Sequence, residues 1–310
     1  MKIAIMGAGS MGMLFGSYLS KENEVLLIDV DGAKVEKINR EGIRIREADG
    51  RMVTASARAA LPAQAAGPVD LVLLFVKAMD SRQALENSRT VIGAGTLVMS
   101  LQNGSGHDAV IRDFVSEDRI VLGTTQHNSS IMETGLIHHG GGGKTYIGLI
   151  KGDKDRLIPV EETLNRCGID TQICTDIRRK IWEKLFLNAS VSALTAILQV
   201  KLGFLTQSWH AWLIVRQLIK EAVAVARAEG FEFDEDSVAG GVRRLLERAS
   251  EGLTSICADV RDGRRSEVDT ISGAVVEAGK RNGVPVPGHE LVVLLIHAME
   301  DRGSGKEKQK

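Results

Sequence analysis

The segment from Met1 to Ser20 constrains the fold most, because a short apolar strand pattern, a glycine-rich turn and a helical pattern follow one another directly. The turn reads Gly7-Ala8-Gly9-Ser10-Met11-Gly12. In a turn of this kind the first glycine permits the sharp bend, the second lets a pyrophosphate approach the backbone, and the third lets the helix pack on the strand. The helix N-terminus adds N–H donors and a positive dipole. We therefore expect a dinucleotide here; the alternative is a tight turn without a ligand.

A second strand pattern, Glu24 to Asp29, ends in an acid. An acid at this place accepts hydrogen bonds from the adenosine ribose and repels a 2′-phosphate, so Asp29 favours NAD(H) over NADP(H). The alternative is that Asp29, together with Asp31, only caps the following helix.

The first half of the chain alternates short β-branched runs with helical patterns. The run from Val69 to Val76 is wholly apolar, which is typical of a central parallel strand covered on both faces. Such alternation predicts a Rossmann-type, doubly wound sheet over residues 1–175, in the α/β class. Two segments do not alternate, and we expect both to be β-hairpins. They are 42–57, with an Asp49-Gly50 turn, and 135–149, with glycines 140–143 at the tip.

The second half has helical periodicity and few strand signals. It predicts an all-helical domain over residues 176–302, followed by a flexible tail at 303–310. The expected helices span residues 177–198, 207–229, 234–250, 267–281 and 288–301.

Composition restricts the partners. The formal net charge of −1 provides no global basic field for nucleic acid or an anionic membrane. Cys167, Cys174 and Cys257 form no CxxC pair, so we expect free thiols in a reducing compartment. We expect no leader and no run of membrane-spanning length, and we expect a cytoplasmic protein. His138-His139 has no carboxylate or further histidine at ligand spacing, so no metal site is expected.

Polar residues recur every four positions on one predicted helix, at Lys180, Lys184, Asn188 and Ser192. This spacing places neighbours on one helix face. A solvated face is the usual explanation. However, the stretch from Asn188 to Leu198 carries no charge, which favours burial.

Several motifs follow one another along the chain: Gly7-Ala8-Gly9-Ser10-Met11-Gly12, Val76-Lys77-Ala78, Leu101-Gln102-Asn103-Gly104, Trp182-Glu183-Lys184-Leu185 with Asn188, Leu194-Thr195-Ala196, Ser255 with Asp259, and Glu267 with Asp269. Through these motifs the sequence resembles the ketopantoate reductases (2-dehydropantoate 2-reductases) over nearly its whole length.

The resemblance implies a two-domain reductase of pantothenate biosynthesis that forms a homodimer through its helical domain, with its active site in the cleft between the domains. Lys184 would protonate the ketone of a 2-oxo acid while the nicotinamide delivers hydride, and Glu267 would hold the substrate hydroxyl and the lysine. The other implied roles are substrate binding by Asn188, Ser192 and Ser255, a place between substrate and nicotinamide for Asn103, and the adenosine end of the cofactor for Lys77.

The chemistry agrees with these roles. Reduction of a ketone needs a cationic acid beside the developing alkoxide. Burial lowers the pKa of a lysine towards neutrality, and a nearby carboxylate raises it again. Without the resemblance, Lys184 is an ordinary surface lysine and Glu267 is an acid at a helix N-terminus after Ser266.

The chain departs from the family pattern in three places. Ser192 stands where relatives often carry asparagine, and Gly252 is smaller than the polar residue frequent there. Both changes remove potential substrate contacts and enlarge the expected pocket, which admits a bulkier 2-oxo acid. Typical members prefer NADPH and carry an arginine where this chain has Asp29-Val30-Asp31, although Lys77 remains as a partner for a 2′-phosphate.

Two other functions stay open. One is an NAD-dependent D-2-hydroxyacid dehydrogenase on the same scaffold, and the other is a non-catalytic dinucleotide-binding sensor. A sensor has no need of a proton donor such as Lys184. His127 is either a substrate contact or structural, and Trp209 and Trp212 are core or interface aromatics.

Overall fold

The computed structural model describes residues 1–304, and their contacts divide into two units. The first comprises Met1–Gln102 and His107–Lys180, and the second comprises Asn103–Gly106 and the chain from Ile181 onward. The division falls inside helix α6 (Ile177–Leu198), five residues beyond the boundary expected at 175. Of the tail expected at 303–310, the first two residues continue helix α12 (Pro287–Ser304), and the rest lies outside the described residues.

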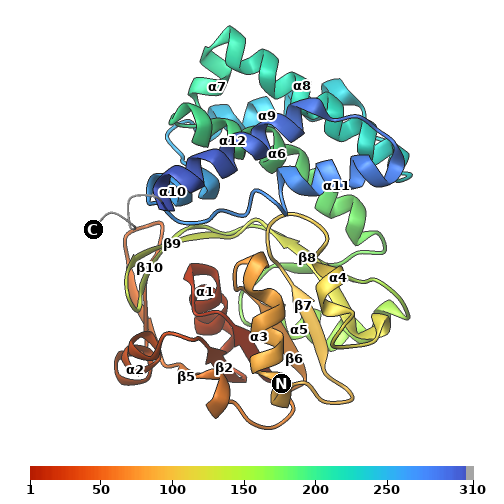
Figure 1. Ribbon diagram of the computed structural model, residues 1–310. Coiled ribbons are helices and arrows are strands. Elements are labelled where there is room, and N and C mark those ends of the chain that lie inside the picture. Colours follow the sequence, from red (N-terminus) through yellow and green to blue (C-terminus); the bar gives the residue numbers. More distant parts are fainter. Residues whose placement is uncertain (305–310) are drawn as a thin grey trace. The chain divides into compact units, whose positions relative to one another are not determined.

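An eight-stranded sheet forms the centre of the first unit (Figure 1). Its order is β12-β11-β8-β7-β6-β1-β2-β5, and all neighbours are parallel except β8 and β11. The order reverses at β1, which is the switch point at which doubly wound sheets bind ligands. The predicted Rossmann-type fold is therefore confirmed. The strands are β1 (Lys2–Met6), β2 (Glu24–Ile28), β5 (Arg58–Ala60), β6 (Leu71–Leu74), β7 (Leu97–Ser100), β8 (Ile120–Thr125), β11 (Thr145–Leu149) and β12 (Thr171–Ile173).

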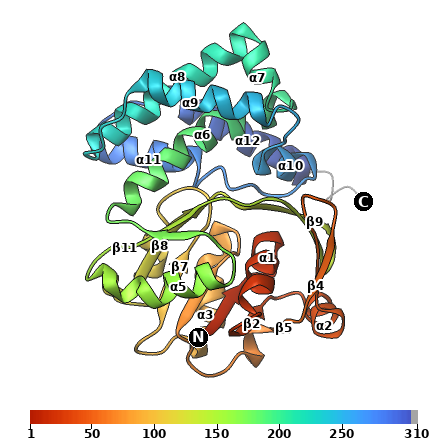
Figure 2. The same ribbon diagram turned by 180° about the vertical axis from the view of Figure 1, so that it is seen from behind.

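Burial explains why these apolar runs become central strands. Every residue of β6 and β7 is buried, and β1 is buried from Ile3 to Met6. Helices connect the strands and cover them, as α5 covers β12 (Figure 2). These helices are α1 (Ser10–Leu19), α2 (Gly32–Glu41), α3 (Ser81–Asn87), α4 (His107–Ile111) and α5 (Ile158–Arg166).

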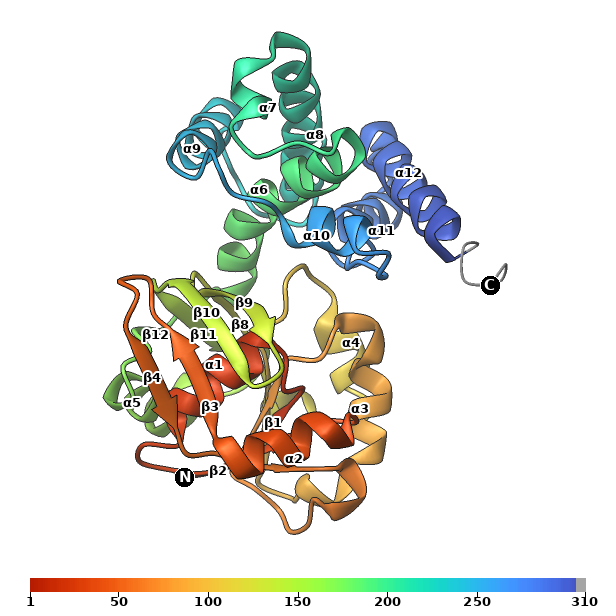
Figure 3. The same cartoon turned by 90° about the vertical axis from the view of Figure 1, so that its left-hand side faces the viewer.

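A second sheet of four strands, ordered β4-β3-β10-β9, lies against α1 (Figure 3). The hairpin predicted at 42–57 is confirmed, because β3 (Ile43–Arg46) pairs antiparallel with β4 (Met52–Ala55).

The hairpin predicted at 135–149 is wrong. Strand β10 (Leu136–Gly141) pairs with β9 (Asn128–Glu133) and β3, whereas β11 pairs with β8 in the large sheet. Glycines 140–143 therefore link two sheets. Two extended segments flanking glycines do not reveal from sequence which partners they pair with.

The second unit is helical, as predicted (Figure 1). The helix expected at 177–198 is α6, but the one expected at 267–281 begins only at Ser272. Two short helices, α7 and α10, were not predicted. Besides α6 and α12, the helices are α7 (Phe204–Gln207), α8 (Trp209–Ala228), α9 (Glu235–Arg248), α10 (Ser255–Arg261) and α11 (Ser272–Asn282).

Helix α6 has the length predicted from sequence, but it contradicts the expectation that no run has membrane-spanning length. It has 22 residues, and a window with a mean hydropathy of 1.2 gives it, alone among residues 1–304, the dimensions of a membrane span. Yet 61% of that window is buried inside the protein. Such burial is the pattern of a helix in a protein core.

A buried carboxylate fixes the start of α12. Glu221 on α8 is 5% exposed and accepts the backbone N–H groups of Gly288 and His289, each at 3.1 Å. A Cβ at Gly288 would lie 2.9 Å from Glu221 Oε1, so glycine allows this close approach. The carboxylate pairs donors that a helix start leaves without intrahelical partners.

Candidate functional site

The glycine loop joins β1 to α1, and its glycines have different roles. Gly7 has a φ of +98°, and a Cβ there would lie 2.7 Å from the Val76 nitrogen. A Cβ at Gly12 would lie 1.9 Å from the Gly7 carbonyl oxygen. The fold itself therefore requires both glycines. Around Gly9, in contrast, a Cβ would meet no described protein atom within 4 Å. This open space at the helix N-terminus fits the approach of a pyrophosphate.

Asp29 follows β2 and lies against this loop. Its Oδ2 accepts the Ala8 N–H at 2.8 Å, while Asp31 caps α2 by accepting the Lys34 N–H at 3.1 Å. The capping alternative therefore applies to Asp31 and not to Asp29. The Asp29 carboxylate also accepts from Lys34 Nζ at 3.1 and 3.0 Å, with 10% of the Asp29 side chain exposed.

The sequence reading missed Lys34. Its ammonium partly neutralises Asp29 at the place where an adenosine ribose would bind. The sequence signal for this ion pair is a lysine that stands five residues after the acid, in the first turn of the following helix.

Lys77 lies in the turn after β6, where it is the N-terminal cap residue of a short 3₁₀ turn, Ala78–Asp80. The neighbouring Gln102 is buried, and its amide donates to the Val76 carbonyl at 2.7 Å and to Ser81 Oγ at 2.8 Å. Gln102 thereby ties the end of β7 to the turn that carries Lys77, a role that the sequence reading did not assign.

Helix α6 carries the predicted polar stripe, and the solvated-face alternative is wrong. Lys180 Nζ lies 5.0 Å from the ring centre of Tyr146, and Ser192 is only 4% exposed. Burial lowers the pKa of Lys184 to about 8, against an ordinary value of 10.5, and the carboxylate of Glu267 opposes this shift. A lysine with this pKa holds its proton at neutral pH and releases it readily. Asn188 lies one turn further along α6.

Glu267 does not lie in a helix, contrary to the sequence expectation. It belongs to the turn of residues 266–270, between α10 and α11. This turn also contacts the segment of Asn103, because Thr270 Oγ1 donates to the Asn103 carbonyl at 3.4 Å. The structure therefore brings Glu267 into electrostatic contact with Lys184 and joins its turn to Asn103.

Ser255 is the first residue of α10 and is exposed. The hydroxyl of Thr254 before it lies 2.8 Å from Thr195 Oγ1, which ties the start of α10 to α6. The packing at Gly252 is tight, because a Cβ there would lie 3.0 Å from the Ala249 carbonyl oxygen and 3.1 Å from Leu202 Cδ1, and the enlarged pocket stays a prediction. Packing of the local turn accounts for this glycine.

His127 belongs to a packed network in the first unit. Its ring stacks on that of His139 at 5.4 Å, and His139 Nδ1 lies 2.7 Å from Glu47 Oε2 and 3.1 Å from the Tyr18 hydroxyl. Burial, and then the charge of His139, lower the pKa of His127. The structure thus favours the structural role. Folding brings a carboxylate and a second histidine to His139, which the spacing argument did not foresee, although residues 1–304 contain no cluster of three such residues able to hold a metal ion.

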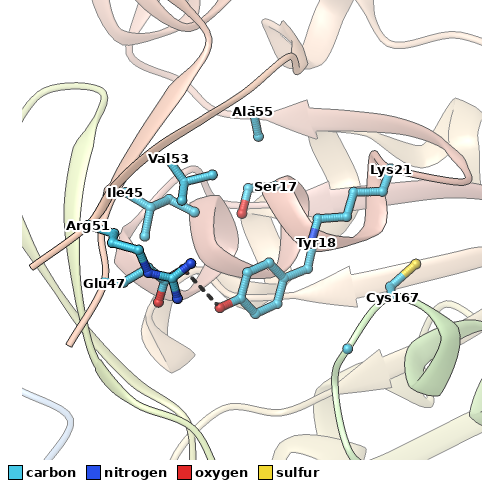
Figure 4. A pocket seen from close by; sticks show the side chains of 10 residues that line it. Ser17, Tyr18, Lys21, Ile45, Glu47, Arg51, Val53, Ala55 and Cys167 are labelled. Atoms are coloured by element: carbon cyan, nitrogen blue, oxygen red, sulfur yellow. Dashed lines mark hydrogen bonds between the residues drawn. The ribbon is translucent and has the colours of Figure 1, made fainter. Parts of the chain in front are cut away.

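A cavity of about 330 Å³ lies beside this network (Figure 4). None of the predicted site residues lines it. It is formed by the last turn of α1, the β3–β4 hairpin and the turn at Cys167, with Tyr18, Lys21 and Glu47 in its wall. The cavity therefore lies at the opposite end of α1 from the glycine loop.

Comparisons with known proteins find relatives along nearly the whole chain. Residues 3–152 match the family described as "Ketopantoate reductase PanE/ApbA", and residues 176–300 match its C-terminal part. The chain is 31% identical to the 2-dehydropantoate 2-reductase of Halobacterium salinarum, covering 93% of this chain and 95% of that one. It is 30% identical to that of Pyrococcus horikoshii, covering 99% and 100%. A structure of D-mandelate dehydrogenase with NADH and anilino(oxo)acetate has a TM-score of 0.93 at 30% identity, covering 98% and 99%.

The glycine loop yields a test of ligand binding. We predict that Gly9→Ala folds normally but weakens NADH binding about tenfold, or ~1.4 kcal/mol, because its methyl group occupies space that the pyrophosphate needs. Gly12→Ala should instead destabilise the first unit. Gly32→Ala, where a Cβ also meets no described atom within 4 Å, is the matched control. Nicotinamide fluorescence titration and thermal unfolding measure both effects; wild-type affinity in Gly9→Ala would contradict the assignment.

Proposed function

Because this chain belongs to the ketopantoate reductase PanE/ApbA family, we propose that it reduces the ketone of a 2-oxo acid, with ketopantoate as substrate and pantoate as product. It is a nicotinamide-dependent oxidoreductase. The observation that carries the proposal is the placement of Lys184 in a buried setting beside the carboxylate of Glu267; burial lowers the pKa of this lysine to about 8, and the carboxylate opposes the shift.

The proposed chemistry needs a bound dinucleotide and a proton donor. Residues of the glycine loop, with Asp29 and Lys77, would hold the dinucleotide, whose reduced nicotinamide would supply a hydride when bound. Lys184 donates its Nζ proton to the ketone oxygen and stabilises the negative charge that develops there. Glu267 keeps Lys184 protonated at neutral pH and accepts a hydrogen bond from a substrate hydroxyl.

Neutral polar groups complete the proposed substrate site. Asn188, Ser192 and Ser255 would bind the carboxylate and hydroxyl of the substrate, and Asn103 would contact the substrate and the nicotinamide. Ser192 has a shorter side chain than the asparagine frequent in relatives, and it is 4% exposed in α6, so its proposed contact with the substrate is the more restricted one.

The substrate is tested by steady-state assays of ketopantoate against a panel of 2-oxo acids, with NADH and NADPH. The panel includes 2-oxo-2-phenylacetate, because a D-mandelate dehydrogenase is among the similar structures. We expect the highest kcat/KM with ketopantoate. A higher value with the aryl acid would establish the hydroxyacid dehydrogenase instead, and no turnover with any 2-oxo acid would favour the sensor.

We also propose a homodimer in the cytoplasm. Leu291, Leu294 and Leu295 share one face of α12 and are 56%, 67% and 40% exposed, and Trp209 on α8 is 69% exposed. A second copy of the chain would cover such apolar side chains. All three cysteines are free thiols, which suits a reducing compartment.

Lys184 predicts the pH dependence. Since the acid must be protonated, kcat/KM for reduction should be constant below about pH 8 and fall tenfold per unit above it. Glu267→Gln should move this decline to lower pH, because Glu267 raises the pKa of Lys184.

Lys184→Ala should lower kcat by about 10²–10⁴ while dinucleotide binding survives. Near-normal turnover in Lys184→Ala would exclude the mechanism.

Asp29 predicts the cofactor preference. We expect NADH to bind more tightly than NADPH, because the Asp29 carboxylate, held against the glycine loop, would accept hydrogen bonds from the adenosine ribose and repel a 2′-phosphate. Asp29→Ala should reduce the ratio of the NADPH dissociation constant to the NADH dissociation constant. Lys34→Ala should increase this ratio, since the Lys34 ammonium partly neutralises Asp29. Asp31→Ala, which removes an equal charge from a capping residue, serves as the control and should leave the ratio unchanged. Tighter NADPH binding by the wild type would refute this role of Asp29.

A further inference from the structure

The turn of residues 266–270 carries Glu267 yet has no regular secondary structure of its own, so other elements must hold it. On one side it is tied to α12. Glu300 Oε1 accepts the Ser266 backbone N–H at 2.9 Å and the Ser266 hydroxyl at 2.7 Å. Ser266 is 2% exposed, and the Glu300 side chain is 8% exposed. Such buried, charge-assisted bonds to the residue next to Glu267 restrict its position strongly.

A histidine on the same helix completes this attachment. His297 Nε2 lies 2.9 Å from Asp269 Oδ1, and His297 Nδ1 lies 3.3 Å from Glu300 Oε2. Burial opposes the charge on His297, but its bonds to Asp269 and Glu300 outweigh burial and raise its pKa. In Glu300, burial is likewise outweighed by the bonds from Ser266 and His297, and the pKa is lowered. The protonated imidazole of His297 and the ionised carboxylate of Glu300 are therefore favoured, and their opposite charges attract each other.

The other side of the turn is tied to the Asn103–Gly106 segment. Ser105 donates its backbone N–H to the Thr270 carbonyl at 2.9 Å. Gly104 has a φ of +99°, and a Cβ there would lie 1.9 Å from the same oxygen. Just beyond the turn, the Ser272 hydroxyl donates to the Ala189 carbonyl on α6, next to Asn188, at 3.2 Å. The turn is thus held between α12, the Asn103 segment and α6.

We propose that Glu300, supported by His297, is a positioning residue: it holds the turn of residues 266–270 so that the Glu267 carboxylate stays beside the Lys184 ammonium. Neither residue touches the reacting atoms. This role rests on the proposed function of Lys184 and Glu267, and it explains why an acid and a histidine near the end of α12 bond to one turn. A small displacement of a catalytic carboxylate is enough to lower a rate severely.

The test compares three substitutions on α12. Glu300→Ala removes the acceptor for Ser266, whereas Glu300→Gln keeps an acceptor oxygen. Glu290→Ala removes an exposed acid from the same helix and is the control. We expect Glu300→Ala to lower kcat at least about tenfold with unchanged NADH binding. Glu300→Gln should recover most of the rate, and Glu290→Ala should leave it unchanged.

A readout at Lys184 separates positioning from general stability. In Glu300→Ala the alkaline decline of kcat/KM should move to lower pH, as in Glu267→Gln, and combining the two substitutions should add no further shift. If Glu300→Ala does not fold, His297→Ala, at a side chain only 33% exposed, should give a smaller shift in the same direction. An unchanged pH profile, or additive shifts, would overturn the proposal.

The same titration is measurable without turnover. Lysines are reductively methylated with a ¹³C label, and the NMR signal of Lys184 is identified by its loss in Lys184→Arg. Glu300→Ala should lower the titration midpoint of this signal, and Glu290→Ala should not. If no 2-oxo acid is reduced but the midpoint still falls, the proposed function fails while the positioning role stands. An unchanged midpoint in an active enzyme overturns the positioning role alone.

Discussion

The charge interaction between Lys184 and Glu267 is the constraint on which the rest of this account depends. Lys184 lies on the polar stripe of α6 and loses hydration through burial, and that loss alone moves its pKa towards the physiological range. The opposing carboxylate keeps the ammonium charged at neutral pH, where a proton donor is useful. The pair requires α6 and the turn before α11 to be held together. The ties from Ser272 to α6 and from Ser266 to α12 therefore matter as much as the two charges.

The geometry of the glycine loop was predictable from sequence because it is local. Gly7 and Gly12 are required by backbone conformation and close approach within one strand–turn–helix unit. Asp29 lies against the loop because the end of β2 lies beside the end of β1 in a doubly wound sheet, and its role at the ribose stays a prediction. The apolar run that became β6 and the long helix α6 were equally clear, because burial alone produces both patterns.

What sequence could not supply depends on contacts between distant segments. The neutralisation of Asp29 by Lys34 depends on side-chain rotamers. The pairing of β10 with β3, and not with β11, depends on which sheet each strand joins. Glu267 was expected inside a helix, but Ser266 and Asp269 bond to α12, and regular helix begins only at Ser272. The sequence does not decide whether His127 contacts substrate or has a structural role, because its stacking on His139 joins two distant segments.

Chemical rescue of Lys184→Ala tests the central claim most directly. If Lys184 supplies the proton, small alkylammonium ions added to the variant should restore hydride transfer, measured as loss of nicotinamide absorbance in a single turnover. The restored rate should follow the concentration of the protonated amine and rise as the ammonium becomes more acidic. The wild-type enzyme should not respond. Failure of every amine to restore the rate, or a restored rate that ignores amine protonation, would contradict the assignment of Lys184 as the general acid.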